Sequence, residues 1–154
     1  MRCVDSSPGA STDSAARELR DAFVRAVPPP HLTVEPPRGV LPQVPTLFDS
    51  GQPAVLEPSV HALAGTQVVL RPVARWHWDF GDGTSLDTQV PGSHYPDLTV
   101  SHVYRAVGTF LVRVRTTWTA TFTVNGSSPR AVDGSVTQHA QLAVRVGQGR
   151  AVLR

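Results

Sequence analysis

The sequence contains no lysine, so its fourteen basic residues are all arginines, and Asn125 is its only asparagine. Because lysine and asparagine both have A-rich codons, this double shortage indicates a high-GC bacterial genome. The arginines are scattered and never form a run of five. We therefore assign the net charge of +2 to a solvated surface and do not expect a nucleic-acid partner.

Cysteine occurs once, at Cys3, which excludes an internal disulfide and a cysteine metal cluster. Only Met1 and Arg2 precede it, whereas a lipid-bearing cysteine follows an apolar segment. We expect neither a lipoprotein signal nor an intact secretory leader in the sequence given. No apolar run approaches the roughly 20 residues of a transmembrane helix, so none is expected.

The composition of the 154 residues, 40% hydrophobic and 17% charged, is typical of a globular protein with a single core. Residues 1–12 are small and polar and are expected to be disordered. From Asp13, a plausible N-cap, to Val27, an apolar stripe that includes Leu19 and Phe23 recurs at helical spacing. Pro28 ends this helix, which is too short to persist alone and should either dock or fray.

Nine of the fourteen prolines fall between Pro28 and Pro58. Proline fixes its own backbone torsion and favours an extended conformation in the residue before it. Residues 28–53 are therefore predicted to be a polyproline-like connector, with Leu47 and Phe48 contacting the domain that follows.

Residues 54–147 contain short runs rich in β-branched and aromatic residues, most of them with period-two alternation. Turn dipeptides such as Asn125-Gly126 separate the runs. The pattern predicts an all-β sandwich of immunoglobulin-like type, followed by a tail at 148–154.

The stretch "RWHWDFGDGTS" contains the densest aromatic cluster of the chain. In a strand, Trp76, Trp78 and Phe80 point to one face, which must be buried. A second alternating row, Phe110, Val112 and Val114, is predicted to face them across the sandwich. Gly81, Asp82 and Gly83 then form a tight turn, in which Asp82 can accept hydrogen bonds from backbone amides.

Tyr104 stands at the corner before the second alternating row, where a tyrosine commonly donates a hydrogen bond to backbone upstream. His102 is predicted to be half-buried beside it. Trp118 and Phe122 fit either an exposed sugar-binding strip or the inner face of an additional hairpin, and we favour the second because isolated aromatic residues are usually packed.

The motifs "WDFGDGT" and "SHVYRAVGTFLVRV" together resemble the signature of the polycystic kidney disease (PKD) domain family, in particular PKD-domain proteins of actinobacteria. The residues that carry the resemblance are Trp78, Asp79, Phe80, Gly81, Asp82, Gly83, His102, Tyr104 and Gly108. It implies a non-catalytic module, extracellular or in the cell envelope, that contacts protein or polysaccharide or spaces other components. The loop Thr84–Val100 and the additional hairpin exceed the minimal family pattern.

The motif carboxylates raise the question of a metal site. Asp79 and Asp82, with Asp87 or Asp97, could supply oxygen atoms to calcium, which takes six to eight such ligands. Some PKD domains bind calcium, so the alternative function is a calcium-stabilised structural domain accessory to a secreted hydrolase. We favour carboxylates that serve their turn, and we expect no cofactor.

Catalytic motifs are missing from the sequence. "DFG" matches the kinase magnesium triplet, but the chain lacks the lysine, the glycine-rich loop and the H-R-D motif of a kinase. It has neither a G-x-S-x-G elbow nor H-E-x-x-H. No residue is assigned as catalytic, and the chain is not expected to be an enzyme.

Overall fold

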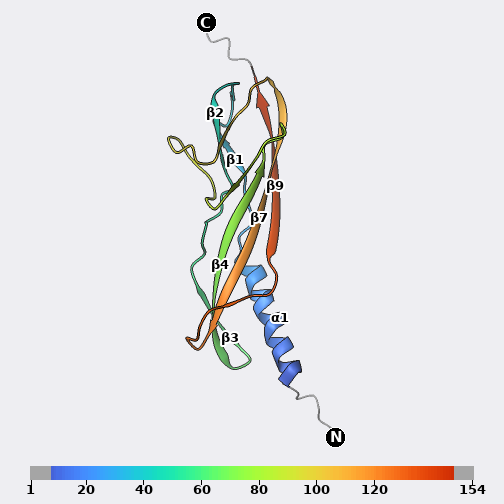
Figure 1. The fold of residues 1–154 in the computed structure, drawn as a ribbon, viewed down its shortest axis with the longest axis vertical. Helices are drawn as coiled ribbons and strands as arrows, with labels where there is room; N and C mark the ends of the chain where they lie inside the picture. The colour runs from blue at the N-terminus through green and yellow to red at the C-terminus, as the bar shows by residue number, and fades with distance from the viewer. Residues whose placement is uncertain (1–7, 148–154) are drawn as a thin grey trace. The chain divides into compact units, whose positions relative to one another are not determined.

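The structure is a computed structural model that describes residues 8–147, with side chains from residue 14 onward (Figure 1). Residues 1–7, the first part of the segment expected to be disordered, and the expected tail at 148–154 lie outside the described residues. Residues 8–12 were also expected to be disordered, and this prediction is wrong because they belong to a helix.

One helix and nine strands follow one another along the described chain. They are α1 (Pro8–Ala26), β1 (Thr33–Glu35), β2 (Pro45–Asp49), β3 (Ser59–Leu63), β4 (Thr66–Asp79), β5 (Ser85–Thr88), β6 (Ser101–Val103), β7 (Gly108–Val124), β8 (Arg130–Ala131) and β9 (Val136–Val146). The strands form two sheets, one in the order β1-β2-β6 and one in the order β3-β4-β7-β8, in which β5 also pairs with β4 and β9 with β7. The all-β prediction is confirmed.

The described residues form two compact units, where the length had predicted a single core. Unit 1 contains residues 8–28, 55–73 and 118–136, and unit 2 contains residues 29–54, 74–117 and 137–147. The reason is strand length: β4 has 14 residues and β7 has 17, against about 5 or 6 in an ordinary strand, so each supplies residues to both units.

In unit 1 the helix α1 contacts β3 and buries its apolar stripe. Leu19 and Phe23 are 7% and 0% exposed, which confirms docking over fraying. The helix begins at Pro8, five residues before the predicted N-cap at Asp13. Proline is well suited to the first helical turn because the amide hydrogen that it lacks has no partner there.

The additional hairpin of unit 1 is formed by β7 and β8, in the register Thr121↔Ala131. Asn125 and Gly126 have φ angles of 49° and 78°, as a tight hairpin turn requires. Trp118 is 0% exposed, so the prediction that it packs in the core is confirmed and an exposed sugar-binding strip that includes it is excluded.

In unit 2 the two sheets meet through aromatic side chains. Trp76, Trp78 and Phe80 are buried as predicted, at 1%, 0% and 2% exposure. Phe48 of β2 contacts Trp78 and Phe80, with ring centroids 5.8 and 5.3 Å apart. Val112 and Val114 are buried as well, at 0% and 1% exposure. Because β7 is the neighbour of β4 in the same sheet, the prediction that this row faces the β4 aromatic residues across the sandwich is wrong.

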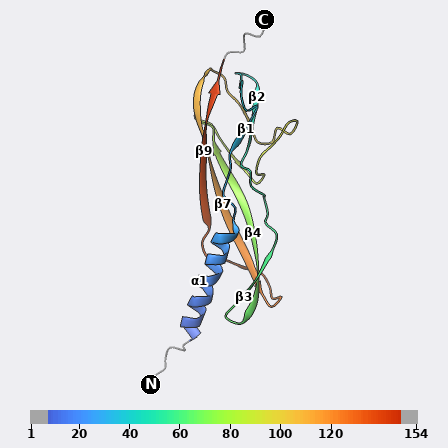
Figure 2. The same cartoon turned by 180° about the vertical axis from the view of Figure 1, so that it is seen from behind.

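The proline-rich segment 28–53 is more than the predicted connector, because it contains β1 and β2. Strand β2 pairs with β6 in the register Thr46↔His102, and β1 pairs with β2 in the register Val34↔Phe48. Figure 2 shows β1 and β2 side by side. Pro45 is the first residue of β2, a position at which a strand tolerates proline. The buried Phe48 fulfils the expected contact with the sandwich.

Candidate functional site

The glycine-aspartate-glycine turn after β4 is a self-contained structural element. Gly81 and Gly83 have φ angles of 87° and 91°, a region that favours glycine. Asp79 Oδ1 accepts a hydrogen bond from the Gly81 amide at 3.0 Å. Asp82 Oδ1 accepts hydrogen bonds from the amide and hydroxyl of Thr84 at 3.2 and 2.6 Å. Both carboxylates therefore stabilise the backbone of their own turn.

His102 connects this turn to β6. Its Nε2 lies 2.7 Å from Asp82 Oδ2, and its ring stacks on Phe80 at a centroid distance of 4.4 Å. Partial burial acts to raise the pKa of Asp82, but the hydrogen bonds from Thr84 and His102 outweigh it and leave that pKa below its ordinary value. The prediction that His102 is a half-buried hydrogen-bonding residue is confirmed.

Tyr104 forms the predicted corner. Its hydroxyl donates to the Phe80 carbonyl at 2.8 Å, and the side chain is 0% exposed. Burial raises the pKa of this phenol, so it stays a neutral donor. Gly108, the last motif residue, begins β7. The motif residues predicted from sequence thus join β4, β6 and β7 within unit 2.

The carboxylates proposed from sequence for calcium each have a local partner. Asp87 Oδ1 lies 2.7 Å from His77 Nδ1, and Asp97 Oδ1 accepts from the amide and hydroxyl of Thr99 at 2.9 and 2.6 Å. Among the side chains that the structure describes, no group of three or more carboxylate, histidine or cysteine residues is arranged so that it could hold a metal ion. The structure therefore supplies no ligand set around Asp79 and Asp82.

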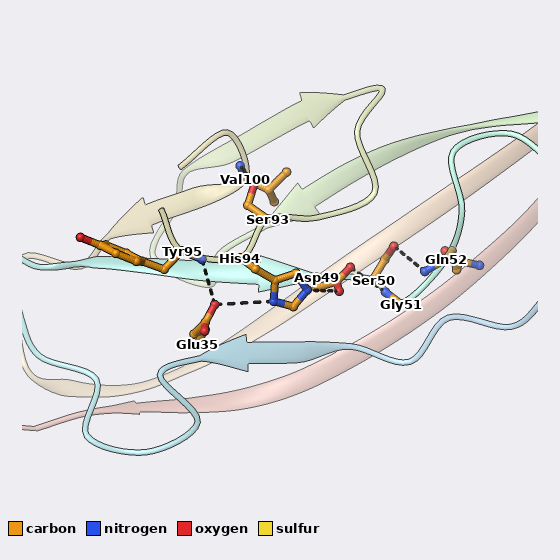
Figure 3. Close-up of polar contacts among 9 residues, drawn as sticks. All are labelled: Glu35, Asp49, Ser50, Gly51, Gln52, Ser93, His94, Tyr95 and Val100. Atoms are coloured by element: carbon orange, nitrogen blue, oxygen red, sulfur yellow. Dashed lines mark hydrogen bonds and ion pairs between the residues drawn. The ribbon is translucent and has the colours of Figure 1, made fainter. Parts of the chain in front are cut away.

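The loop Pro91–Thr99, here called the tyrosine loop, is part of the segment Thr84–Val100 that exceeds the minimal family pattern. His94 Nε2 lies 2.8 Å from Asp49 Oδ2, and His94 Nδ1 lies 3.6 Å from Glu35 Oε1 (Figure 3). The amide of Tyr95 donates to the same Glu35 oxygen at 3.2 Å. The side chains of Glu35, Asp49 and His94, which we call the His94 clasp, fix the loop to the ends of β1 and β2.

Backbone hydrogen bonds fix both ends of the tyrosine loop to β2. The Ser93 amide donates to the Phe48 carbonyl at 2.9 Å, and the Phe48 amide donates to the Val100 carbonyl at 3.1 Å. Ser93 Oγ accepts from the Val100 amide at 2.8 Å. At Gly92 a Cβ atom would lie 2.4 Å from Asp49 Cα, so only glycine fits this crossing.

The outer part of the tyrosine loop is exposed although its base is fixed. Tyr95 is 77% exposed and Leu98 is 48% exposed. The Tyr95 ring points away from the His94 clasp (Figure 3). A large amphipathic ring is thus presented to solvent by a backbone that is held in place.

The histidines of the described chain do not complete a catalytic triad. A triad needs a nucleophile on one ring nitrogen and a carboxylate on the other. His102 Nε2 contacts both Thr84 Oγ1 and Asp82, and His94 has a carboxylate at each nitrogen. Ser59 Oγ lies 2.8 Å from His61 Nε2, but no carboxylate in the described range contacts that imidazole.

The fold and this site define an all-β domain of two sheets in which the signature motif is a structural corner. A model of the family described as PKD domain matches residues 40–120, and the chain belongs to this family. PKD domains are a non-catalytic kind of domain that occurs in extracellular proteins. The match begins inside the proline-rich segment, consistent with β2 being part of the sandwich.

A solved structure similar to this chain is the PKD domain from the human VPS10 domain-containing receptor SorCS2, determined in solution. It shares 16% sequence identity with a TM-score of 0.43, over 81% of this chain and 80% of that one. The comparison with curated proteins found no match. Helix α1 is not apolar enough to span a bilayer, and the described part of the chain has no other helix.

Proposed function

We propose that the chain is a non-catalytic interaction module, located outside the cell or in the cell envelope, that binds a protein or polysaccharide through the tyrosine loop. Family membership supports the kind of module. The exposure of Tyr95 supports the assignment of the contact to the tyrosine loop.

The observation that carries this proposal is the combination of an exposed Tyr95 with a loop base that is fixed at several points. Tyrosine is enriched among the residues that dominate binding energy, because its ring offers a large contact area together with a hydrogen-bonding hydroxyl. A loop that is already ordered loses little conformational entropy when it binds. Tyr95 therefore has the properties of an anchor residue, and Leu98 is a second exposed apolar residue of the same loop.

The test is a binding measurement with the cell-envelope and extracellular fractions of the source organism. Wild type and Tyr95→Ala are incubated with each fraction, and bound protein is quantified over a range of concentrations. Val60→Ala is the matched control, since Val60 is a 60% exposed apolar residue on β3. We expect Tyr95→Ala to weaken binding about tenfold or more, a typical cost for an anchor residue, and the control to bind as wild type.

Two results would overturn the proposal. One is that Tyr95→Ala binds as tightly as wild type. The other is that neither fraction retains the wild-type protein at any concentration used. Thermal unfolding of Tyr95→Ala should be unchanged, because the ring has few contacts to lose.

A further inference from the structure

The outward face of the β4-β7-β9 sheet in unit 2 concentrates positive charge. Period-two alternation directs Trp76 of β4 inward and Arg75 outward, and in the same way buries Val114 of β7 between Arg113 and Arg115. All three arginines are exposed. Strands β4 and β7 are neighbours and β9 pairs with β7, as Figure 1 shows, so these side chains lie on one surface, here called the arginine face.

Two shallow grooves follow one another across the arginine face. The first, of about 420 Å³, is lined by Arg75, His77 and Arg115, with Thr88 and Gln89 contributing polar groups. The second, of about 510 Å³, contains His77 and Arg115 again, together with Arg113, His139 and Gln141. Because they share two lining residues, the grooves form one continuous track that suits an extended ligand better than a small one.

One carboxylate lines each groove, Asp87 in the first and Asp79 in the second. Both have hydrogen-bond partners other than the arginines: Asp87 lies 2.7 Å from His77, and Asp79 accepts the Gly81 amide. Within the described residues, no carboxylate comes within 4.0 Å of Arg75, Arg113 or Arg115. A guanidinium group presents a planar set of donors that matches a carboxylate with two parallel hydrogen bonds. These arginines are therefore available to an external anion.

We propose that the arginine face binds an acidic polysaccharide, a linear sugar polymer that carries carboxylate groups. The arginines would pair with the carboxylates, while Thr88, Gln89 and Gln141 offer hydrogen bonds to sugar hydroxyls. A single-stranded nucleic acid fits less well, because its binding depends on aromatic side chains that stack on the bases. In unit 2 the β4 aromatic residues Trp76 and Trp78 are buried beneath this face. This surface is separate from the tyrosine loop and does not depend on its function.

The experiment uses polygalacturonate as probe and measures binding to the full chain at low and at physiological salt. The test variant is Arg113→Gln/Arg115→Gln, and the control variant Arg38→Gln/Arg105→Gln removes the same charge from exposed positions outside both grooves. We expect the test variant to lose about tenfold in affinity and the control to lose less than twofold. Wild-type binding should weaken as salt rises, because exposed charge pairs are screened.

Further arms separate this proposal from others. Neutral dextran, which carries no charge, should not bind. Single-stranded DNA should bind more weakly than polygalacturonate. The Tyr95→Ala variant should bind polygalacturonate as the wild type does, because Tyr95 is not part of the arginine face. The proposal is overturned if polygalacturonate does not bind, if both double variants lose affinity equally, or if dextran or DNA binds as well. Should the test variant unfold, Arg75→Gln in the lining of the first groove replaces it, with the same expected direction and a smaller loss.

Discussion

Gly81 and Gly83 provide a matched pair of substitutions to alanine that tests whether the turn is a structural element. Both have φ near 90°, so each alanine adds backbone strain of about 1–2 kcal/mol. At Gly83 nothing lies within 4 Å of a Cβ atom. At Gly81 that atom would lie 2.6 Å from the Leu111 carbonyl oxygen and 2.9 Å from the Leu111 amide nitrogen. Since Leu111 is part of β7, this clash should cost about 1–3 kcal/mol more.

Urea denaturation followed by tryptophan fluorescence measures the difference. With a slope of about 1–3 kcal/mol per molar, Gly81→Ala should unfold at a midpoint lower than that of Gly83→Ala by roughly 1 M. Equal midpoints for the two variants would refute the inference that Gly81 is required for close approach to β7. A lower urea midpoint for Gly83→Ala alone, with Gly81→Ala unfolding like the wild type, would refute the turn geometry itself.

Three further predictions concern hydrogen bonds of the motif and the loop. Tyr104→Phe should lower the free energy of unfolding by about 1–3 kcal/mol, because the buried Phe80 carbonyl loses its donor. An unchanged free energy of unfolding, measured by urea denaturation, would contradict the structural role of the Tyr104 corner. Asp82→Ala should lower the free energy of unfolding by about 1 kcal/mol, because the turn loses hydrogen bonds. Added calcium should not raise the melting temperature of the wild type. A calcium-dependent rise that Asp82→Ala and a chelator abolish would establish a metal site instead. His94 has a raised pKa, chiefly because of its hydrogen bond to Asp49. The stability that His94 contributes is therefore fully present below about pH 6.5 and is lost as the pH rises through the higher pKa of the folded state. A difference in stability between wild type and His94→Gln that does not shrink toward pH 9 would contradict this.

The aromatic core and the corner could be predicted from sequence because each depends on local order. Alternation alone determines which face of a strand Trp78 and Phe80 occupy, and the glycines around Asp82 specify the turn. The place of Tyr104 at the corner predicted a hydrogen bond to upstream backbone, and the structure identifies its acceptor as the Phe80 carbonyl. Neither inference required knowledge of a distant segment.

The remaining features depend on contacts between distant segments. The His94 clasp joins residues 35, 49 and 94, and no spacing in the sequence marks that group. Strand β2 was not predicted, because the surrounding prolines favour an extended connector. Its backbone hydrogen bonds come from pairing with β6, a distant segment, and strand propensity alone does not predict such a pairing. The helix α1 begins at Pro8 and not at the predicted N-cap Asp13, because proline is accepted in the first turn of a helix.

The measurement that tests the proposed function most directly is site-specific photo-crosslinking at the tyrosine loop. A photoreactive phenylalanine analogue is placed at Tyr95 in one protein and at Val60 in another, because both positions are exposed. Each is irradiated with the cell-envelope and extracellular fractions, and the crosslinked species are identified by mass spectrometry. We expect one defined crosslinked partner from position 95. Excess unlabelled wild type should displace it, and position 60 should not yield it. The same products from both positions, or none from position 95, would contradict the proposed function.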